Sequence, residues 1–247
     1  MAVMPAELEV TGRFFNPAPR ISVIQITNGQ VCVVVDDVLS DPEALISWAA
    51  AQTFEPPRDY PYPGLVLAAP AAVAQLVGEH FAEYARSRLK GRRTLAVTVR
   101  LSMVTVPPAE LDPVQWQCHR DRVAAEPDQV IFAAMVLYLF RNPALGGTSF
   151  YRPRLPSDQT DRMIADSQMM TADEFTARYG LHSGYMSGGN PYFEHITSVP
   201  AAWNRMIYYD GGLFHSADIG AASQLSRDPR AGRLTLNGFF TCRRVAS

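Results

Sequence analysis

The stretch QVIFAAMVLYLFRNPALGGTSFYRP (residues 129–153) decides the expected fold of this chain. Residues 130–140 form an apolar run of aliphatic and aromatic side chains, which is typical of a buried strand. A turn, RNPALGG, follows, and TSFYRP then has the composition of a second strand. The apolar run is much shorter than the ~20 residues that a membrane-spanning helix needs. The pattern therefore predicts two neighbouring strands of a β-rich domain.

Further strand patterns lie on both sides of this pair. They are TLAVTVRLSMVTV (94–106), VQWQCHRD (114–121), YFEHITSVPA (192–201), NRMIYYDGG (204–212) and GRLTLNGFFTC (232–242). Residues 157–180 are polar with helical spacing, and Thr171 and Glu174 have the spacing of a capping box. We therefore predict a mainly β body interrupted by a lid-like insertion at residues 153–191.

The N-terminal part is expected to add a strand and two helices. Residues 31–39 have the pattern of a buried strand, and in the helical segment 40–52 Ser40 and Glu43 have capping-box spacing. The proline-rich segment 54–70 is predicted to be a loop, and residues 71–89 have the spacing of an amphipathic helix.

Composition limits the class of protein. The chain has 247 residues, of which 47% are hydrophobic and 19% charged, and we find no repeat or linker. We expect a single domain over residues 1–247, with residues 1–93 as an N-terminal strand and helices and residues 94–243 as the β core. The net charge of −2 disfavours a nucleic-acid partner. All the basic residues but Lys90 are arginines, so a bound anion would be held by a guanidinium group.

The cysteines and the chain's ends indicate a cellular setting. Cys32, Cys118 and Cys242 are far apart and form no C-x-x-C pair, which argues against a disulfide scaffold and a zinc knuckle. No signal peptide and no membrane span are evident. We expect a cytoplasmic protein without a membrane partner.

His119 and Asp121 form an H-x-D pair at the end of the strand pattern 114–121. Side chains two residues apart in a strand point to the same face. His215, which follows the strand pattern 204–212 where the chain leaves regular structure, is the best-placed third ligand. Two histidines and one carboxylate form a facial triad with open positions, which indicates non-haem Fe(II) and O2 chemistry. An ordinary surface pair at a strand end remains the alternative interpretation of H-x-D.

Arg233 and Thr235 lie on one face of the strand pattern 232–242 and can together bind a carboxylate. A charge in an otherwise apolar strand needs a partner, so a structural salt bridge is the alternative role for Arg233. Arg227 and Arg230, in the loop RDPRAG, remain open as alternative anion anchors.

The order of these motifs resembles that of a known family. H-x-D (119–121), GGTSFY (146–151), the distal His215 and G-R-x-T (232–235) look like the 2-oxoglutarate/Fe(II)-dependent dioxygenases, especially their prolyl-4-hydroxylase-like branch. The segment VVVDDVLSDPEALISWA (33–49) is similar to the strand and helix that open that branch.

The resemblance implies a fold, a reaction and a set of roles. The fold is a double-stranded β-helix of the jelly-roll or cupin type, with flanking helices and with iron at its open end. The reaction converts 2-oxoglutarate and O2 to succinate and CO2 while a substrate C–H bond is oxidised, and Asp at the carboxylate position favours hydroxylation over halogenation. The implied roles are Fe(II) ligands for His119, Asp121 and His215, and contacts with the distal carboxylate of 2-oxoglutarate for Arg233, Thr235 and Tyr138.

Two other classes of function stay open at this stage. One is a catalytically silent double-stranded β-helix that binds a ligand, and the other is a cupin-like metal enzyme that does not use 2-oxoglutarate. The substrate expected for the oxygenase is an amino acid, a peptide or a small natural product, and the sequence does not predict the oligomeric state.

Overall fold

The computed structural model describes residues 13–27, 29–121 and 129–245. The first residues of the chain, where no signal peptide is predicted, lie outside this part. Its strands form two antiparallel sheets. Among the described residues, no helix is long and apolar enough to cross a membrane.

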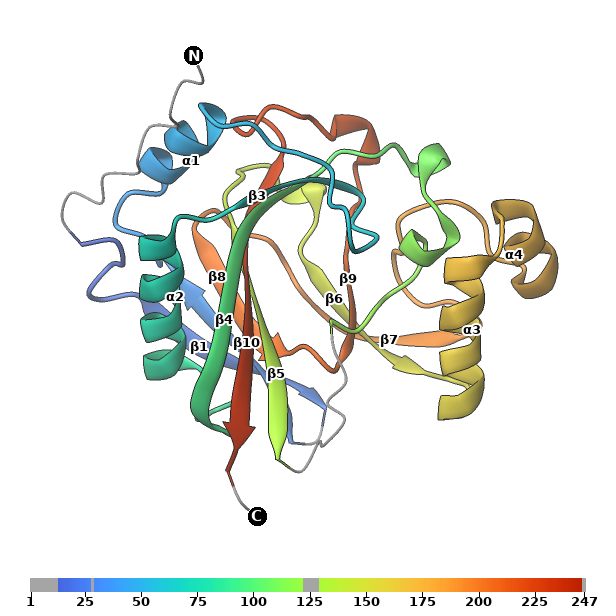
Figure 1. Ribbon diagram of the computed structural model, residues 1–247, viewed down its shortest axis with the longest axis horizontal. Coiled ribbons are helices and arrows are strands. Elements are labelled where there is room, and N and C mark those ends of the chain that lie inside the picture. The colour runs from blue at the N-terminus through green and yellow to red at the C-terminus, as the bar shows by residue number, and fades with distance from the viewer. Residues whose placement is uncertain (1–12, 28, 122–128, 246–247) are drawn as a thin grey trace.

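The larger sheet has seven strands (Figure 1). In spatial order they are β1 (Arg20–Thr27), β2 (Gln30–Asp36), β8 (Arg205–Asp210), β5 (Val130–Tyr138), β10 (Arg233–Arg244), β4 (Gly91–Val104) and β3 (Gly64–Ala68). The smaller sheet contains β7 (Phe193–Val199), β6 (Thr148–Pro153) and β9 (Phe214–Ala217) in that order. Its free edge at β9 is extended by an isolated bridge between His119 and His215.

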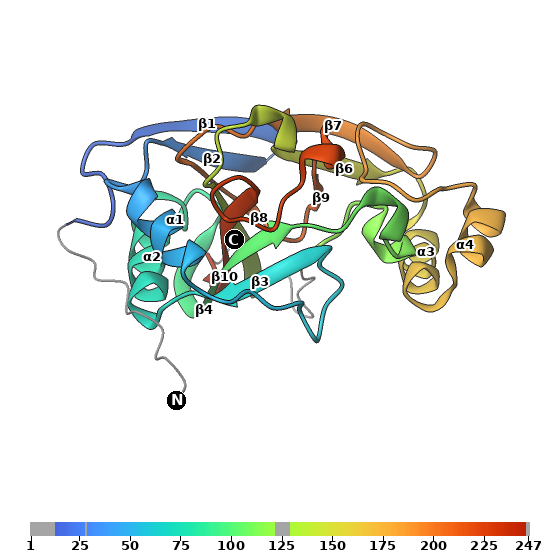
Figure 2. The same ribbon diagram turned by 90° about the horizontal axis from the view of Figure 1, so that it is seen from above.

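The chain alternates between the two sheets in the manner of a jelly roll. It runs from β4 in the large sheet to the His119 segment in the small one, returns to β5, crosses to β6 and β7, returns to β8, crosses to β9 and ends in β10. This connectivity is that of a double-stranded β-helix, so the predicted fold class is confirmed. Figure 2 shows the two layers, with β1 at the edge of the large sheet beside β7 of the small one.

Four α-helices flank the sheets at opposite ends of the molecule (Figure 2). Helices α1 (Pro42–Ala50) and α2 (Ala71–Tyr84) cover the outer face of the large sheet, where the Phe81 ring stacks on Phe240 at 3.9 Å between centroids. Helices α3 (Ser157–Met169) and α4 (Ala172–Tyr179) lie beyond the small sheet and bury Met163 and Phe175. Burial of side chains of this size contributes about 1.5–3 kcal/mol each, so the helices fix the positions of both sheets.

Alternation along β10 sends its side chains to two different environments. Leu234 and Leu236 join the core beneath α1 and α2, whereas Arg233 and Thr235 point between the two sheets. Tyr138 of β5 stands directly opposite Thr235 and shares that inner face. The interior between the sheets is therefore where the chain collects its buried polar groups.

Several local predictions are confirmed and others are wrong. The Thr171–Glu174 capping box begins α4 as predicted. The segment 54–70 is not all loop, because it contains β3. Helix α1 is capped by Asp41, whose carboxylate accepts from Ala44 N at 3.0 Å, and not by Ser40.

The segments that carry the candidate ligands also differ from prediction. Residues 114–121 are not a regular strand, since a 3-10 turn occupies Pro113–Gln115 and pairing is limited to the bridge at His119. His215 does not follow the regular structure but lies within β9.

Candidate metal centre

Two histidines far apart in sequence face each other across the edge of the small sheet. The amide of His119 donates to the carbonyl of His215 at 2.9 Å, and the amide of His215 donates back to the carbonyl of His119 at 2.9 Å. Directly opposite residues of an antiparallel pair place their side chains on one face. The two imidazole rings consequently lie 4.5 Å apart between centroids.

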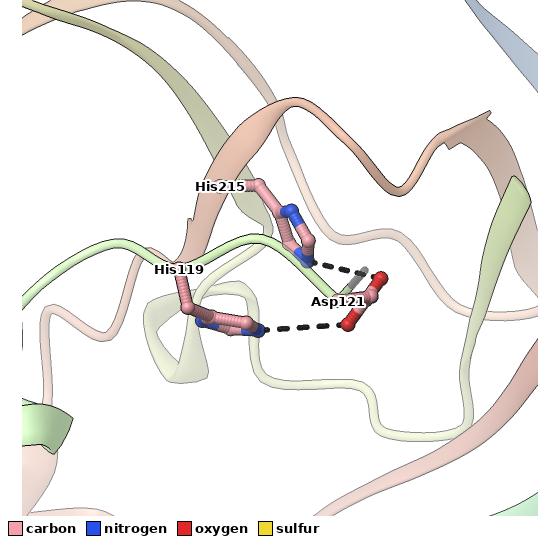
Figure 3. A group of neighbouring side chains, drawn as sticks. All are labelled: His119, Asp121 and His215. Atoms are coloured by element: carbon pink, nitrogen blue, oxygen red, sulfur yellow. Dashed lines mark ion pairs between the residues drawn. The ribbon is translucent and has the colours of Figure 1, made fainter. Parts of the chain in front are cut away.

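Asp121 completes the group (Figure 3). Its amide donates to Gly211 O at 2.9 Å, which turns the carboxylate toward both rings. Oδ1 lies 3.7 Å from His119 Nε2, and Oδ2 lies 3.6 Å from His215 Nε2. The three candidate ligand atoms are all within 4.8 Å of one another, so the structure brings together the three residues that the sequence singled out.

The protonation states suit a cation. Burial lowers the pKa of His215 to about 4, so its ring is neutral at pH 7. A carbonyl oxygen can only accept, so the 2.9 Å contact between His215 Nδ1 and Leu213 O places the ring proton on Nδ1 and the lone pair on Nε2. Desolvation and the neighbouring His215 also lower the pKa of His119 to about 4.

The carboxylate lacks a donor of its own. Asp121 Oδ2 is buried without a hydrogen-bond partner among the described residues, and desolvation raises the pKa of this carboxyl group. A buried carboxylate oxygen without a donor carries a free-energy cost that a metal ion would remove. The donor set of two neutral imidazoles and one carboxylate fits a divalent transition metal, of which Fe(II) with open positions is the best-known case.

The group opens into a cavity of about 820 Å³ between the sheets. His119 and Asp121 line one part of it, and Arg233 lines another. From the predicted insertion 153–191, helix α3 and the loop after α4 also contribute to the wall. The role of this insertion as a lid remains a prediction.

Arg233 is almost completely buried, with 4% of its surface exposed. Its Nε donates to Leu145 O at 2.8 Å, and its Nη2 donates to Gly146 O and Gly147 O at 3.1 Å each. These carbonyls, not a carboxylate, are its partners, and among the described residues it forms no salt bridge. Since these bonds use Nε and Nη2, Nη1 remains for a ligand.

The two glycines of the turn permit this arrangement. Gly146 has a φ of +85°, and a Cβ there would lie 1.8 Å from Asp218 O. A Cβ on Gly147 would lie 2.0 Å from Val199 O. Only glycine fits at both positions, so GG allows the turn to approach Arg233 with three carbonyls.

Tyr138 and Thr235 are not among the residues that line the cavity. The Tyr138 hydroxyl is fully buried and hydrogen-bonds with Thr148 Oγ1 at 2.8 Å. Thr235 Oγ1 donates to Ser102 O at 3.3 Å and accepts from Asn237. Both predicted anchor side chains therefore form hydrogen bonds with other groups of the protein.

A different tyrosine reaches the cavity beside Arg233. Tyr62, just before β3, lines the cavity, and its buried hydroxyl lies near the Ser102 hydroxyl but forms no hydrogen bond of normal geometry among the described residues. Burial raises the pKa of Tyr62 to about 12, against the opposing charges of Arg233 and Arg100. Sequence reasoning missed this residue because it placed residues 54–70 in a loop, and pairing of β3 with β4 is what brings it to the site.

The other candidate residues do not belong to the group of potential metal ligands. Arg227 and Arg230 are exposed and do not line the cavity. Cys118 lines the cavity and is buried in the cluster with Met163 and Phe175, but it is not among the potential ligands.

Fold and site together define a class: a double-stranded β-helix protein with a two-histidine, one-carboxylate group at the edge of its small sheet. Residues 17–240 match a family described as a family of unknown function (DUF6445), and the chain belongs to that family. No curated protein matches the chain significantly.

Solved structures give remote similarities. The chain is 12% identical to HygX from Streptomyces hygroscopicus, solved with nickel and 2-oxoglutarate bound, with a TM-score of 0.45 over 87% of this chain and 84% of that one. The chain is 14% identical to SnoN, a non-haem α-ketoglutarate-dependent epimerase from nogalamycin biosynthesis, with a TM-score of 0.41 over 87% of this chain and 81% of that one. It is 10% identical to an N-substituted L-amino acid dioxygenase from Burkholderia ambifaria AMMD, with a TM-score of 0.37 over 87% of this chain and 86% of that one. Because these TM-scores are below 0.5, function has to be inferred from the site itself.

Proposed function

We propose that the protein is an Fe(II)- and 2-oxoglutarate-dependent oxygenase. The observation that carries the proposal is the convergence of His119, Asp121 and His215, with an unsatisfied buried oxygen on Asp121, at a cavity that also contains Arg233. The two imidazoles and the carboxylate would hold the metal. Fe(II) bound there would supply the oxidative decarboxylation of 2-oxoglutarate by O2, coupled to oxidation of a substrate C–H bond.

The residues of the chain would bind and orient the co-substrate. Arg233 is held rigidly by three backbone carbonyls, so its remaining Nη1 is preorganised to donate to a carboxylate. The hydroxyl of Tyr62 is the second donor, in place of the Tyr138 hydroxyl that the resemblance implied. Thr235 contributes indirectly by fixing the strand beneath Arg233.

The finer assignments belong to the same proposal. Hydroxylation is the favoured outcome, and the substrate is an amino acid, a peptide or a small natural product. Placement in the prolyl-4-hydroxylase-like branch is supported by the order of the H-x-D, GGTSFY, distal histidine and G-R-x-T motifs.

Metal-dependent binding of the co-substrate tests the proposal. Metal-free protein is titrated with 2-oxoglutarate by calorimetry, alone and with Mn(II) as a non-reacting replacement for iron. We expect tight binding only with Mn(II), and its loss in Asp121→Asn. With Fe(II), O2 and ascorbate, slow uncoupled succinate formation should be detected by mass spectrometry. Absence of both binding and succinate would refute the proposal, and metal-dependent turnover without 2-oxoglutarate would favour the cupin-like alternative.

A further inference from the structure

Arg100 is a second arginine in the cavity, and neither the metal group nor the co-substrate anchor uses it. It lies on β4, on the same inward face as Ser102, opposite Asn237 of β10. Its guanidinium carbon lies 4.2 Å from the centre of the Tyr60 ring and 4.6 Å from that of Phe239. Two rings around one guanidinium limit its movement and hold it in a fixed position.

In the part of the chain that the structure describes, this guanidinium has no anionic partner. Its Nε is buried without a hydrogen-bond acceptor, and among the described residues Arg100 forms no salt bridge. A buried N–H without an acceptor destabilises the protein, and more so when the group is charged. Such an arrangement is typical of a site that a ligand completes.

The charges of the cavity wall leave one cation unmatched. Among the described residues, three arginines line the cavity: Arg100, Arg120 and Arg233. Arg120 pairs with Asp161 at 2.7 Å, and the proposed function assigns Arg233 to the co-substrate. Among the described residues that line the cavity, Asp121 carries the only carboxylate, and it belongs to the group of candidate metal ligands. Arg100 therefore remains without an ion-pair partner among the described residues.

Arg100 also lies near the reacting centre. The cavity that Arg100 lines is also lined by two of the candidate metal ligands, His119 and Asp121. An anion bound to Arg100 would sit beside the metal group, where the rest of the bound molecule could present a C–H bond. Phe132 and Phe239 provide apolar wall for that part of the molecule.

We propose that Arg100 is the specificity-determining residue of the substrate site and binds a carboxylate of a small-molecule substrate. A monoanion matches the single unpaired charge, and the planar fork of arginine matches a carboxylate. The cavity volume, about 820 Å³, is in the range of small-molecule sites. This inference rests on the proposed function for the place of 2-oxoglutarate.

Matched pairs of charged and neutral probes test the inference by binding alone. Protein loaded with Mn(II) and 2-oxoglutarate is titrated with acetate, benzoate and 3-phenylpropionate, and with the amide of each, by calorimetry or saturation-transfer NMR. We expect at least one carboxylate to bind tenfold or more tightly than its amide. Arg100→Gln should abolish this preference while changing 2-oxoglutarate affinity less than threefold. Arg120→Gln, which removes a cavity arginine that is already ion-paired, should retain it.

The outcomes separate this inference from the proposed function. If no carboxylate is preferred by the wild type, or if Arg100→Gln keeps the preference, the inference is wrong. A tenfold loss of 2-oxoglutarate affinity in Arg100→Gln would also overturn it, since Arg100 would then hold the co-substrate. If the wild type does not bind 2-oxoglutarate, the proposed function fails. The probe pairs are then titrated against protein with Mn(II) alone, where loss of the preference in Arg100→Gln still supports a carboxylate site.

Discussion

Replacement of Tyr62 by phenylalanine separates binding of the co-substrate from stability of the fold. The Tyr62 hydroxyl is buried beside Arg233 without a hydrogen-bond partner among the described residues. If it donates to the distal carboxylate of 2-oxoglutarate, Tyr62→Phe removes one hydrogen bond to a charged group, which is worth about 1.5–3 kcal/mol. The dissociation constant for 2-oxoglutarate should therefore rise about tenfold to a hundredfold.

The same substitution should leave the unbound protein almost as stable as before. Because the hydroxyl lies near the Ser102 hydroxyl but forms no hydrogen bond of normal geometry among the described residues, its loss should change the free energy of unfolding by less than about 0.5 kcal/mol. Tyr138→Phe is the matched control, since it also removes one buried phenol oxygen. There the 2.8 Å bond to Thr148 is lost, so unfolding should become about 1 kcal/mol easier while 2-oxoglutarate affinity stays within twofold.

Calorimetry with Mn(II)-loaded protein gives the affinities, and urea denaturation of the metal-free protein gives the free energies of unfolding. The reverse pattern, in which Tyr138→Phe loses 2-oxoglutarate and Tyr62→Phe binds it normally, would refute the assignment of the anchor. It would restore the role that the family resemblance implies for Tyr138.

Four further predictions follow from single contacts. Asp121→Asn should weaken Mn(II) binding at least tenfold by electron paramagnetic resonance, and unchanged affinity would contradict the metal assignment. Gly211→Ala would place a Cβ 3.1 Å from Asp121 Oδ2, so Mn(II) affinity should fall several-fold while circular dichroism stays unchanged. Arg233→Met would leave the carbonyls of Leu145 and Gly146 unpaired, since Gly147 O still accepts from Asp218 N, and should lower the free energy of unfolding by about 3 kcal/mol, measured in urea. Burial lowers the pKa of His80 to about 4, so the unfolded chain, with a histidine pKa near 6.5, binds the proton first, and His80 lowers stability by up to ~3 kcal/mol as pH drops from about 6.5 to 4. Because burial also lowers the pKa of His119 and of His215, His80→Phe should make that part of the pH profile shallower without abolishing its slope, and an unchanged slope would exclude a contribution from His80.

Strands whose signal is local were predictable from the sequence. The segments that become β4 and β5 are long and rich in apolar residues, so period and composition identify them without tertiary information. β3 is short and directly follows a proline-rich segment, and that composition led to the prediction of a loop. What makes Gly64–Ala68 a strand is the neighbouring edge of β4, which supplies its hydrogen bonds.

The same distinction applies to the site. The i, i+2 spacing of His119 and Asp121 is a local rule, and it holds even though the segment is not a regular strand, because amide bonds to His215 and Gly211 keep it extended. The hydrogen-bond partners of Arg233 lie instead in a turn 86 to 88 residues away in sequence. No pattern in the residues around Arg233 predicts that it binds this turn.

The difference between the two arginines follows from this geometry. Arg233 is satisfied by carbonyls on one edge, so it can hold its position before any ligand arrives, as a co-substrate anchor must. Arg100 is positioned by aromatic rings and its buried Nε has no acceptor among the described residues, so we expect an anion from outside to stabilise it. A sequence shows two arginines on neighbouring strands. Only the partners that folding brings to each one distinguish a group that is already satisfied from one that requires a ligand.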